Sequence, residues 1–209
     1  MPAAKPANAK KQAALRPRNA AATREAILKS ARKAFAAHGY DGAGLREIAA
    51  EAGVTAMLVN RYFGSKEQLF EEVIDHTMAG ASVIREGIGD LPNLGDYLAA
   101  GLLATTSPDA APLDGSLMMI RSASTANPRV AEIGRRQIEK RHLKTLAAAL
   151  KGEHAAERAA LILSLIAGVQ VMRQMIGLSA LAKTPPATLH KLLAPVIQKL
   201  ANPPIRPPR

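Results

Sequence analysis

The chain contains no cysteine and no tryptophan, and aromatic side chains make up only 3% of its 209 residues. Without cysteine it has no disulfide, no thiolate nucleophile and no cysteine-ligated metal or redox centre. Clusters of β-branched residues are few, so the 48% hydrophobic content consists mainly of Ala, Leu, Ile and Met, which are good helix formers. This composition is sufficient for a packed core and predicts an all-α protein of one domain or two small ones.

Acidic residues are also scarce, with 17 Asp and Glu against 28 Lys and Arg, a formal net charge of +11. Such a charge attracts a polyanion, either nucleic acid or an anionic membrane surface. The N-terminus lacks the apolar stretch of a signal peptide, and the most apolar segment, residues 159–171, is short for a membrane span and is bounded by Arg158 and Arg173. We therefore expect a soluble cytoplasmic protein that has no membrane partner.

Motifs for catalysis are missing as well. There is neither a phosphate-binding glycine loop nor a nucleophile elbow, and the five histidines are scattered singly. Glu139 and His142 fall on one face of a predicted helix, as in a di-iron bundle, but such a site needs a second pair and two further glutamates at matching positions. We expect no enzyme, no metal site and no cofactor.

Helical periodicity runs between two tails. Residues 1–22 carry Lys and Arg, no acid and almost no large apolar side chain, which predicts a disordered basic arm that either lies along DNA or is a solvated tail. Residues 202–209 form a Pro-rich tail. About nine helices are predicted between them, over residues 23–39, 45–52, 55–63, 65–87, 94–106, 113–125, 129–151, 155–181 and 186–201. We place a domain boundary at 75/76, giving domains over 23–75 and 76–201.

Gly53 separates two short helices at a steep bend, which a residue tolerant of positive φ makes at low cost. Thr55 is suited to cap the helix that follows. This arrangement predicts a helix-turn-helix over about residues 44–63, whose second helix can enter the major groove of DNA. A single glycine between apolar stripes also fits an ordinary helical hairpin.

The next turn carries groups that suit a phosphate. Tyr62 and Lys66 flank it, and Ser65 with Gln68 forms a capping box for the fourth helix. A phenol, an ammonium and a helix N-terminus on one edge predict a grip on the DNA backbone. The alternative is a capped surface turn with a solvated lysine.

Residues 23–73 closely resemble the N-terminal domain of the TetR family of bacterial transcriptional regulators. The shared positions are Ile27, Ala31, Phe35, Gly39, Tyr40, Leu45, Arg46, Glu47, Ile48, Ala49, Gly53, Val54, Thr55, Tyr62, Phe63, Ser65, Lys66 and Glu67. The resemblance implies a three-helix DNA-binding domain followed by a helical ligand-binding and dimerisation domain. It also implies repression of a DNA operator that is relieved by a small molecule.

Carried over by position, the resemblance gives a set of DNA-binding residues in which Thr55 caps the recognition helix. The others are Ala56, Met57, Leu58, Asn60, Arg61, Tyr62, Lys66 and Arg46. Met57 or Leu58 can touch thymine methyl groups, Asn60 can pair with adenine, and Arg61 can pair with guanine. Alternatively, Leu58 packs against the second helix and Arg61 contacts only the backbone.

The second domain is expected to bind an apolar small molecule in a Met-rich pocket, although the same residues also suit a plain core or a solvent-facing surface. The candidates are Tyr97, Met118, Met119, Arg121, Gln170, Arg173 and Met175, with Met78, Met172 and Gln174 as further ones.

The last two predicted helices are expected to pair with their copies in a homodimer. That interface is assigned to Leu161, Ser164, Leu165, Gly168, Leu192 and Val196. A dimer predicts a palindromic operator in double-stranded DNA; the alternative function is a ligand-independent, basic DNA-coating protein.

Overall fold

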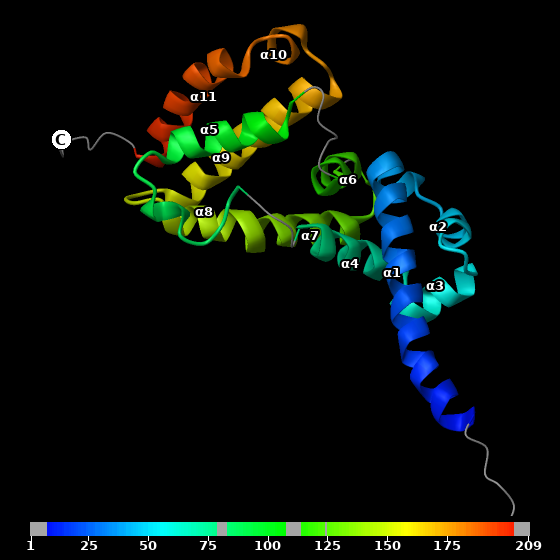
Figure 1. The fold of residues 1–209 in the computed structure, drawn as a ribbon. Helices are drawn as coiled ribbons and strands as arrows, with labels where there is room; N and C mark the ends of the chain where they lie inside the picture. Colours follow the sequence, from blue (N-terminus) through cyan, green and yellow to red (C-terminus); the bar gives the residue numbers. More distant parts are fainter. Residues whose placement is uncertain (1–7, 79–82, 108–113, 124, 203–209) are drawn as a thin grey trace, which may run out of the picture. The chain divides into compact units, whose positions relative to one another are not determined.

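The computed structural model describes residues 8–78, 83–107, 114–123 and 125–202 (Figure 1). Every regular element in these residues is helical, which confirms the all-α prediction. The chain divides into two compact units: Met1–Thr77 with Leu117–Ala131, and Met78–Ser116 with Glu132–Arg209. The first unit therefore contains the predicted helix-turn-helix and also a segment that lies beyond the boundary predicted at 75/76.

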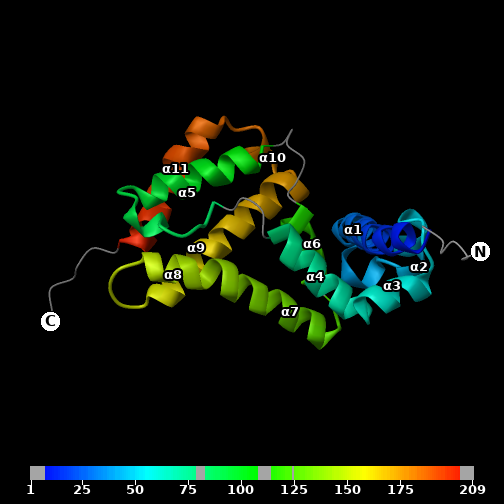
Figure 2. The same cartoon turned by 60° about the horizontal axis from the view of Figure 1, so that its bottom comes forward.

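The first unit is built on four N-terminal helices: α1 (Asn8–Gly42), α2 (Leu45–Glu51), α3 (Ala56–Phe63) and α4 (Lys66–Met78). The end of α6 (Asp114–Ser122) and the start of α7 (Pro128–Ile138) belong to the same unit. In Figures 1 and 2, α2 and α3 follow one another alongside α1. Its buried apolar side chains include Ile27, Ala31, Phe35, Ile48, Val59, Phe63, Leu69, Phe70 and Val73.

Helix α1 begins at Asn8, whereas the sequence predicts a basic arm without regular structure over residues 1–22. Residues 1–7 lie outside the described part of the chain. Ala, Lys, Gln, Leu and Arg dominate the segment and have high helix propensity, so it can extend a helix whose later turns are packed. The regular helix breaks at Gly39, which has φ 67° and ψ −177°.

Helix α4 ends at Met78, although the sequence predicts a helix to about residue 87. Residues 79–82 lie outside the described part, and the chain then reaches the short 3-10 helix η1 (Ile88–Asp90). Gly87, with φ 79°, precedes η1 in a left-handed conformation that a continuing helix does not allow.

The second unit packs α5 (Leu94–Thr105) against α11 (Pro186–Ala201), which lie side by side in Figures 1 and 2. The backbone N–H of Gly95 donates to Oε1 of Gln198 at 2.7 Å and ties the two helices together. The core of this unit includes Leu94, Leu98, Ala99, Leu146, Ala159, Ile162, Ala194 and Ile197.

Two π-helical segments lengthen the helices of the second unit. η2 (Glu139–Leu143) joins α7 to α8 (Lys144–Ala149), and η3 (Val171–Met175) extends α9 (Ala155–Gln170). Gly177, with φ 70°, separates this extension from α10 (Ser179–Ala182), so the single helix predicted over 155–181 was wrong at its end. Over the described residues, the eleven α-helices form ten continuous helices because η2 joins α7 to α8, one more than the nine predicted.

The segment Ala155–Met175 is long and apolar enough to cross a membrane. The expectation that this region is too short for a span was therefore wrong on length, because the helix extends beyond residues 159–171. A single such helix is a weak indication of a membrane span, since core helices of soluble proteins have the same length and composition.

Both arginines of Ala155–Met175 are hydrogen bonded inside the second unit. Nη1 of Arg158 donates to the carbonyls of Leu200 and Ala201 at 3.0 and 2.9 Å. Nη1 of Arg173, a side chain only 2% exposed, donates to the carbonyl of Leu103 at 3.1 Å and to the hydroxyl of Thr106 at 3.0 Å. The two guanidinium groups therefore hold the ends of α11 and α5 against α9 and η3.

Candidate nucleic-acid interface

The turn between α2 and α3 has the geometry that its sequence predicts. Gly53 adopts φ 70°, and its N–H donates to the carbonyl of Ala50 at 3.1 Å. The hydroxyl of Thr55 then accepts from the N–H of Leu58 at 3.3 Å, capping α3. Both local predictions, the glycine bend and the threonine cap, are confirmed.

Helix α3 divides its side chains between the core and the surface. Val59 and Phe63, four residues apart and therefore on one face, are 1% and 6% exposed. Met57 is 80% exposed, and Asn60 and Arg61 are also exposed. The surface of α3 thus presents one large apolar group, one amide and one guanidinium.

The remaining predicted DNA-binding residues of this region differ in exposure. Thr55 is exposed, as is Arg46 on α2, whereas Ala56 and Leu58 are half-buried. Leu58 therefore directs part of its surface into the first unit, as its alternative interpretation requires.

The turn before α4 holds the predicted phosphate-binding groups. Oγ of Ser65 accepts from the N–H of Gln68 at 3.2 Å, which confirms the cap, and Tyr62 and Lys66 are both half-buried. Nζ of Lys66 lies 4.5 Å from the ring centroid of Tyr40, near the carboxylates of Asp41 and Glu67. Burial lowers the pKa of the Lys66 ammonium, and the two negative charges oppose that shift.

Glu67 is the most strongly perturbed acid of this turn. Its carboxylate accepts from its own backbone N–H, from the hydroxyls of Ser65 and Tyr40, and from the amide of Asn127. These donors lower its pKa to about 2, so the group is ionised at neutral pH. In return, burial and the hydrogen bond to Glu67 raise the pKa of the Tyr40 phenol.

Sequence reasoning did not assign a role at this edge to Tyr40, Glu67 or Asn127. Tyr40 and Glu67 are among the positions shared with the TetR family, and this could have indicated a role for them. No sequence feature indicated Asn127, because it lies 60 residues from its partner along the chain.

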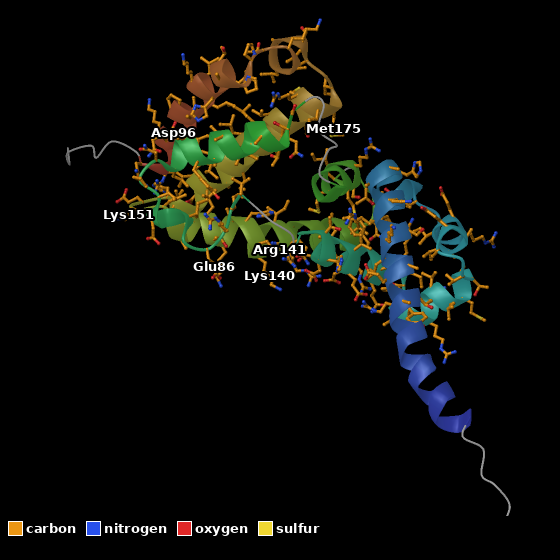
Figure 3. The ribbon with its side chains drawn as sticks, viewed as in Figure 1. Glu86, Asp96, Lys140, Arg141, Lys151 and Met175 are labelled. Atoms are coloured by element: carbon orange, nitrogen blue, oxygen red, sulfur yellow. The ribbon has the colours of Figure 1, made fainter. Side chains whose placement is uncertain are left out.

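The predicted ligand-pocket residues fall into both units. Met118, fully buried, and Met119 and Arg121 belong to the first unit. Arg121 is exposed, and its guanidinium donates to the carbonyl of Ala37 in α1. The others, Tyr97, Gln170, Arg173 and Met175, belong to the second unit, with Met175 at the end of η3 (Figure 3). The pocket therefore stays a prediction. Among the described residues, no group of three or more His, Asp or Glu is placed to hold a metal ion.

The residues predicted for the dimer interface lie on two exposed faces of the second unit. Leu161 on α9 is 55% exposed, and Leu192 and Val196 on α11 are 65% and 50% exposed. Ser164 and Gly168 are exposed, and Leu165 is half-buried. Large apolar side chains therefore face outward on both helices.

A capped, exposed recognition helix beside a second helix N-terminus is the arrangement of helix-turn-helix DNA-binding proteins. The family model described as "Bacterial regulatory proteins, tetR family" matches residues 27–73, and the model described as "Tetracyclin repressor-like, C-terminal domain" matches residues 93–200. The second match covers more than half of the chain, so the chain belongs to the TetR family of bacterial regulatory proteins.

Curated relatives match over only part of the chain. The HTH-type transcriptional repressor NicS of Pseudomonas putida is 38% identical over 65 residues, 31% of each chain. The repressor AcnR of Corynebacterium efficiens is 42% identical over 48 residues, 23% of this chain and 26% of its own. These matches span about a third or less of the relatives' length.

Solved structures match over most of the chain. A transcriptional regulator from Rhodococcus sp. Rha1 is 26% identical, with a TM-score of 0.62 over 85% of this chain and 95% of its own. The multidrug binding protein EbrR, solved in complex with malachite green, is 18% identical, with a TM-score of 0.63 over 86% and 98%. The latter likeness shows the fold alone.

Proposed function

We propose that this protein is a dimeric transcriptional repressor that reads a palindromic operator with α3 and is released by a small molecule. The observation that carries the proposal is the exposed face of α3. Met57, Asn60 and Arg61 are exposed there, while the opposite face of the helix is buried in the core. An amide and a guanidinium pair with adenine and guanine edges in the major groove, each with about 1–3 kcal/mol of discrimination when bidentate. The net charge of +11 adds attraction for the DNA backbone.

The dimer is supported by the exposed apolar side chains of α9 and α11. Leu161, Leu192 and Val196 are each at least half exposed in the single chain, and a second copy that covers them removes this surface from water. A two-fold axis places two copies of α3 about one DNA turn apart and requires a palindrome. We expect Leu192→Glu to convert a dimer to a monomer in light-scattering measurements, while Lys191→Glu, one residue away and exposed, keeps the dimer.

Release by a small molecule is supported by the match of the C-terminal domain model and by the fold shared with EbrR, whose structure holds malachite green. The ligand expected here is apolar and bound in the second unit, where Tyr97, Gln170, Arg173 and Met175 are candidates. A coupling free energy of about 1–3 kcal/mol between ligand and DNA is sufficient to release an operator. A cytoplasmic location follows from this function.

The test is selection of bound duplexes from a randomised library at a fixed, near-physiological salt concentration, because affinity without controlled salt confounds charge with specificity. We expect a palindromic motif. Asn60→Ala and Arg61→Ala should each relax the preference at one position per half-site, whereas Arg129→Ala, an exposed arginine of the same unit outside α3, should leave the motif unchanged.

A flat profile across sequences would instead establish the ligand-independent DNA-coating protein, the second candidate. In that case Arg61→Ala would weaken binding to every sequence equally, as expected for a backbone contact.

A further inference from the structure

A segment far along the sequence is hydrogen bonded to the two helices that flank the helix-turn-helix, at the end of α1 and the start of α4. Ser122, the last residue of α6, and Thr125 and Asn127, which lie between α6 and α7, belong to the same unit as α1. The hydroxyl of Ser122 accepts from the N–H of Tyr40 at 3.1 Å. The hydroxyl of Thr125 donates to Oδ1 of Asp41 at 3.1 Å. This segment therefore holds the C-terminal end of α1 from outside the three-helix domain.

The same segment also reaches the start of α4. Nδ2 of Asn127 donates to Oε1 of Glu67 at 3.3 Å, and Oδ1 of Asn127 accepts from the N–H of Arg129 at 3.0 Å, which fixes the asparagine itself. Helix α7 begins directly after Asn127, and from Glu132 onward its residues belong to the other unit. The residue that binds Glu67 is thus the last one before the helix that links the two units along the chain.

The residues held by this segment, Tyr40, Asp41 and Glu67, all act on the ammonium of Lys66. Its Nζ lies over the ring of Tyr40, and the charges of Asp41 and Glu67 act on it. A cation over an aromatic face is attracted by the electron-rich face of the ring, and a nearby carboxylate adds a Coulombic attraction. Tyr40, the two acids and a DNA phosphate therefore compete for one ammonium.

We propose that Asn127 and Thr125 are positioning residues for the contact of Lys66 with a DNA phosphate. By occupying Glu67 and Asp41 with hydrogen bonds, they keep these carboxylates from pairing with Lys66 and leave its ammonium available to DNA. Thr125 and Asn127 thereby adjust DNA affinity without touching DNA. The inference rests on the proposed function, since it requires that Lys66 binds a phosphate.

The experiment uses the full-length protein and its selected operator, with affinity measured at several salt concentrations. We expect Asn127→Ala and Thr125→Val each to weaken binding about fivefold, equally for all sequences, because a freed carboxylate pairs with Lys66. The slope of log affinity against log salt concentration should become less steep by about one for each phosphate that Lys66 no longer binds. The matched control is Asn93→Ala, an exposed asparagine before α5 whose side chain makes no cap hydrogen bond and which should leave both quantities unchanged.

A Lys66→Gln background separates positioning from general loosening of the fold. If Asn127 acts through Lys66, Asn127→Ala causes no further loss of affinity in Lys66→Gln protein. The same loss in both backgrounds, or no loss in the wild-type background, overturns the proposal. If the wild-type protein binds the operator specifically but neither Asn127→Ala nor Thr125→Val changes the affinity, only this inference is overturned. Absence of specific wild-type binding overturns the proposed function as well.

Discussion

The exposed side chain of Met57 gives the sharpest prediction about operator recognition. Among the exposed large hydrophobic side chains of the described residues, it is the most exposed, at 80%, and it is the second residue of α3. The thymine methyl is the apolar feature of the major groove that such a side chain can cover. We predict that one thymine in each half-site contacts Met57 and that removing its methyl group, by substituting deoxyuridine, weakens binding.

The magnitude follows from the apolar surface that the substitution removes. One buried methyl contributes about 0.8 kcal/mol, which is about fourfold in affinity per half-site. Two half-sites of a palindrome give about 15-fold if their contributions add. The effect belongs to the interface with DNA rather than to the fold, because Met57 contributes little to the core of the free protein.

The assay is fluorescence anisotropy with operators in which each thymine position is replaced in turn, in both half-sites, by deoxyuridine. Wild-type protein should show one sensitive position, and Met57→Ala should lose that sensitivity. Met172→Ala serves as control, since this methionine is 45% exposed but lies in the other unit. If Met57→Ala keeps the full deoxyuridine effect, or if no thymine position is sensitive in wild-type protein, Met57 does not read a methyl group.

Three further predictions concern stability, each measured by urea unfolding. Gly39→Ala should destabilise the protein by at least about 1–2 kcal/mol, since φ is 67° and the new Cβ would lie 2.8 Å from the carbonyl oxygen of Arg121; unchanged stability would contradict that backbone geometry. Arg173→Met should cost about 1–3 kcal/mol by leaving the carbonyl of Leu103 without its donor, and a neutral result would mean that the guanidinium is dispensable. The pKa of Glu67 is lowered to about 2 from its ordinary 4.5, so its carboxylate stabilises the fold above about pH 4.5, and this contribution is lost as pH falls towards 2. In Glu67→Gln the free energy of unfolding should therefore fall less between pH 4.5 and 2 than in the wild type, and an identical fall would refute the assignment.

Local signals in the sequence were sufficient for the helix-turn-helix. The bend at Gly53 and the caps at Thr55 and Ser65 depend on residues within three or four positions, so their geometry follows from nearby sequence. Prediction and structure differ where no local residue decides the outcome. Residues 8–22 have helix-forming composition but little apolar surface, and composition alone does not decide between a solvated arm and an extension of α1.

Contacts between distant segments lay beyond sequence reasoning. Arg121 reaches Ala37 across 84 residues, and Asn127 reaches Glu67 across 60. A polar side chain in an apolar helix is compatible with ligand binding or with a structural hydrogen bond, and the sequence alone does not show that Arg121 donates to the carbonyl of Ala37. The predicted pocket was drawn from residue types in this way, which is why its members fall into both units.

In the proposed function, the eight residues of helix α3 both pack into the core and contact DNA, and the two roles fall on separate positions. Val59 and Phe63 are almost fully buried, so truncating either one leaves a cavity and costs about 2–5 kcal/mol. Met57, Asn60 and Arg61 are exposed, and surface substitutions of this kind usually change stability by less than about 0.5 kcal/mol. If these three side chains read the operator as proposed, substitutions there should change operator preference without loss of the fold. The same separation makes affinity differences among variants at these three positions interpretable as contacts to DNA, provided that their unfolding curves coincide with that of the wild type.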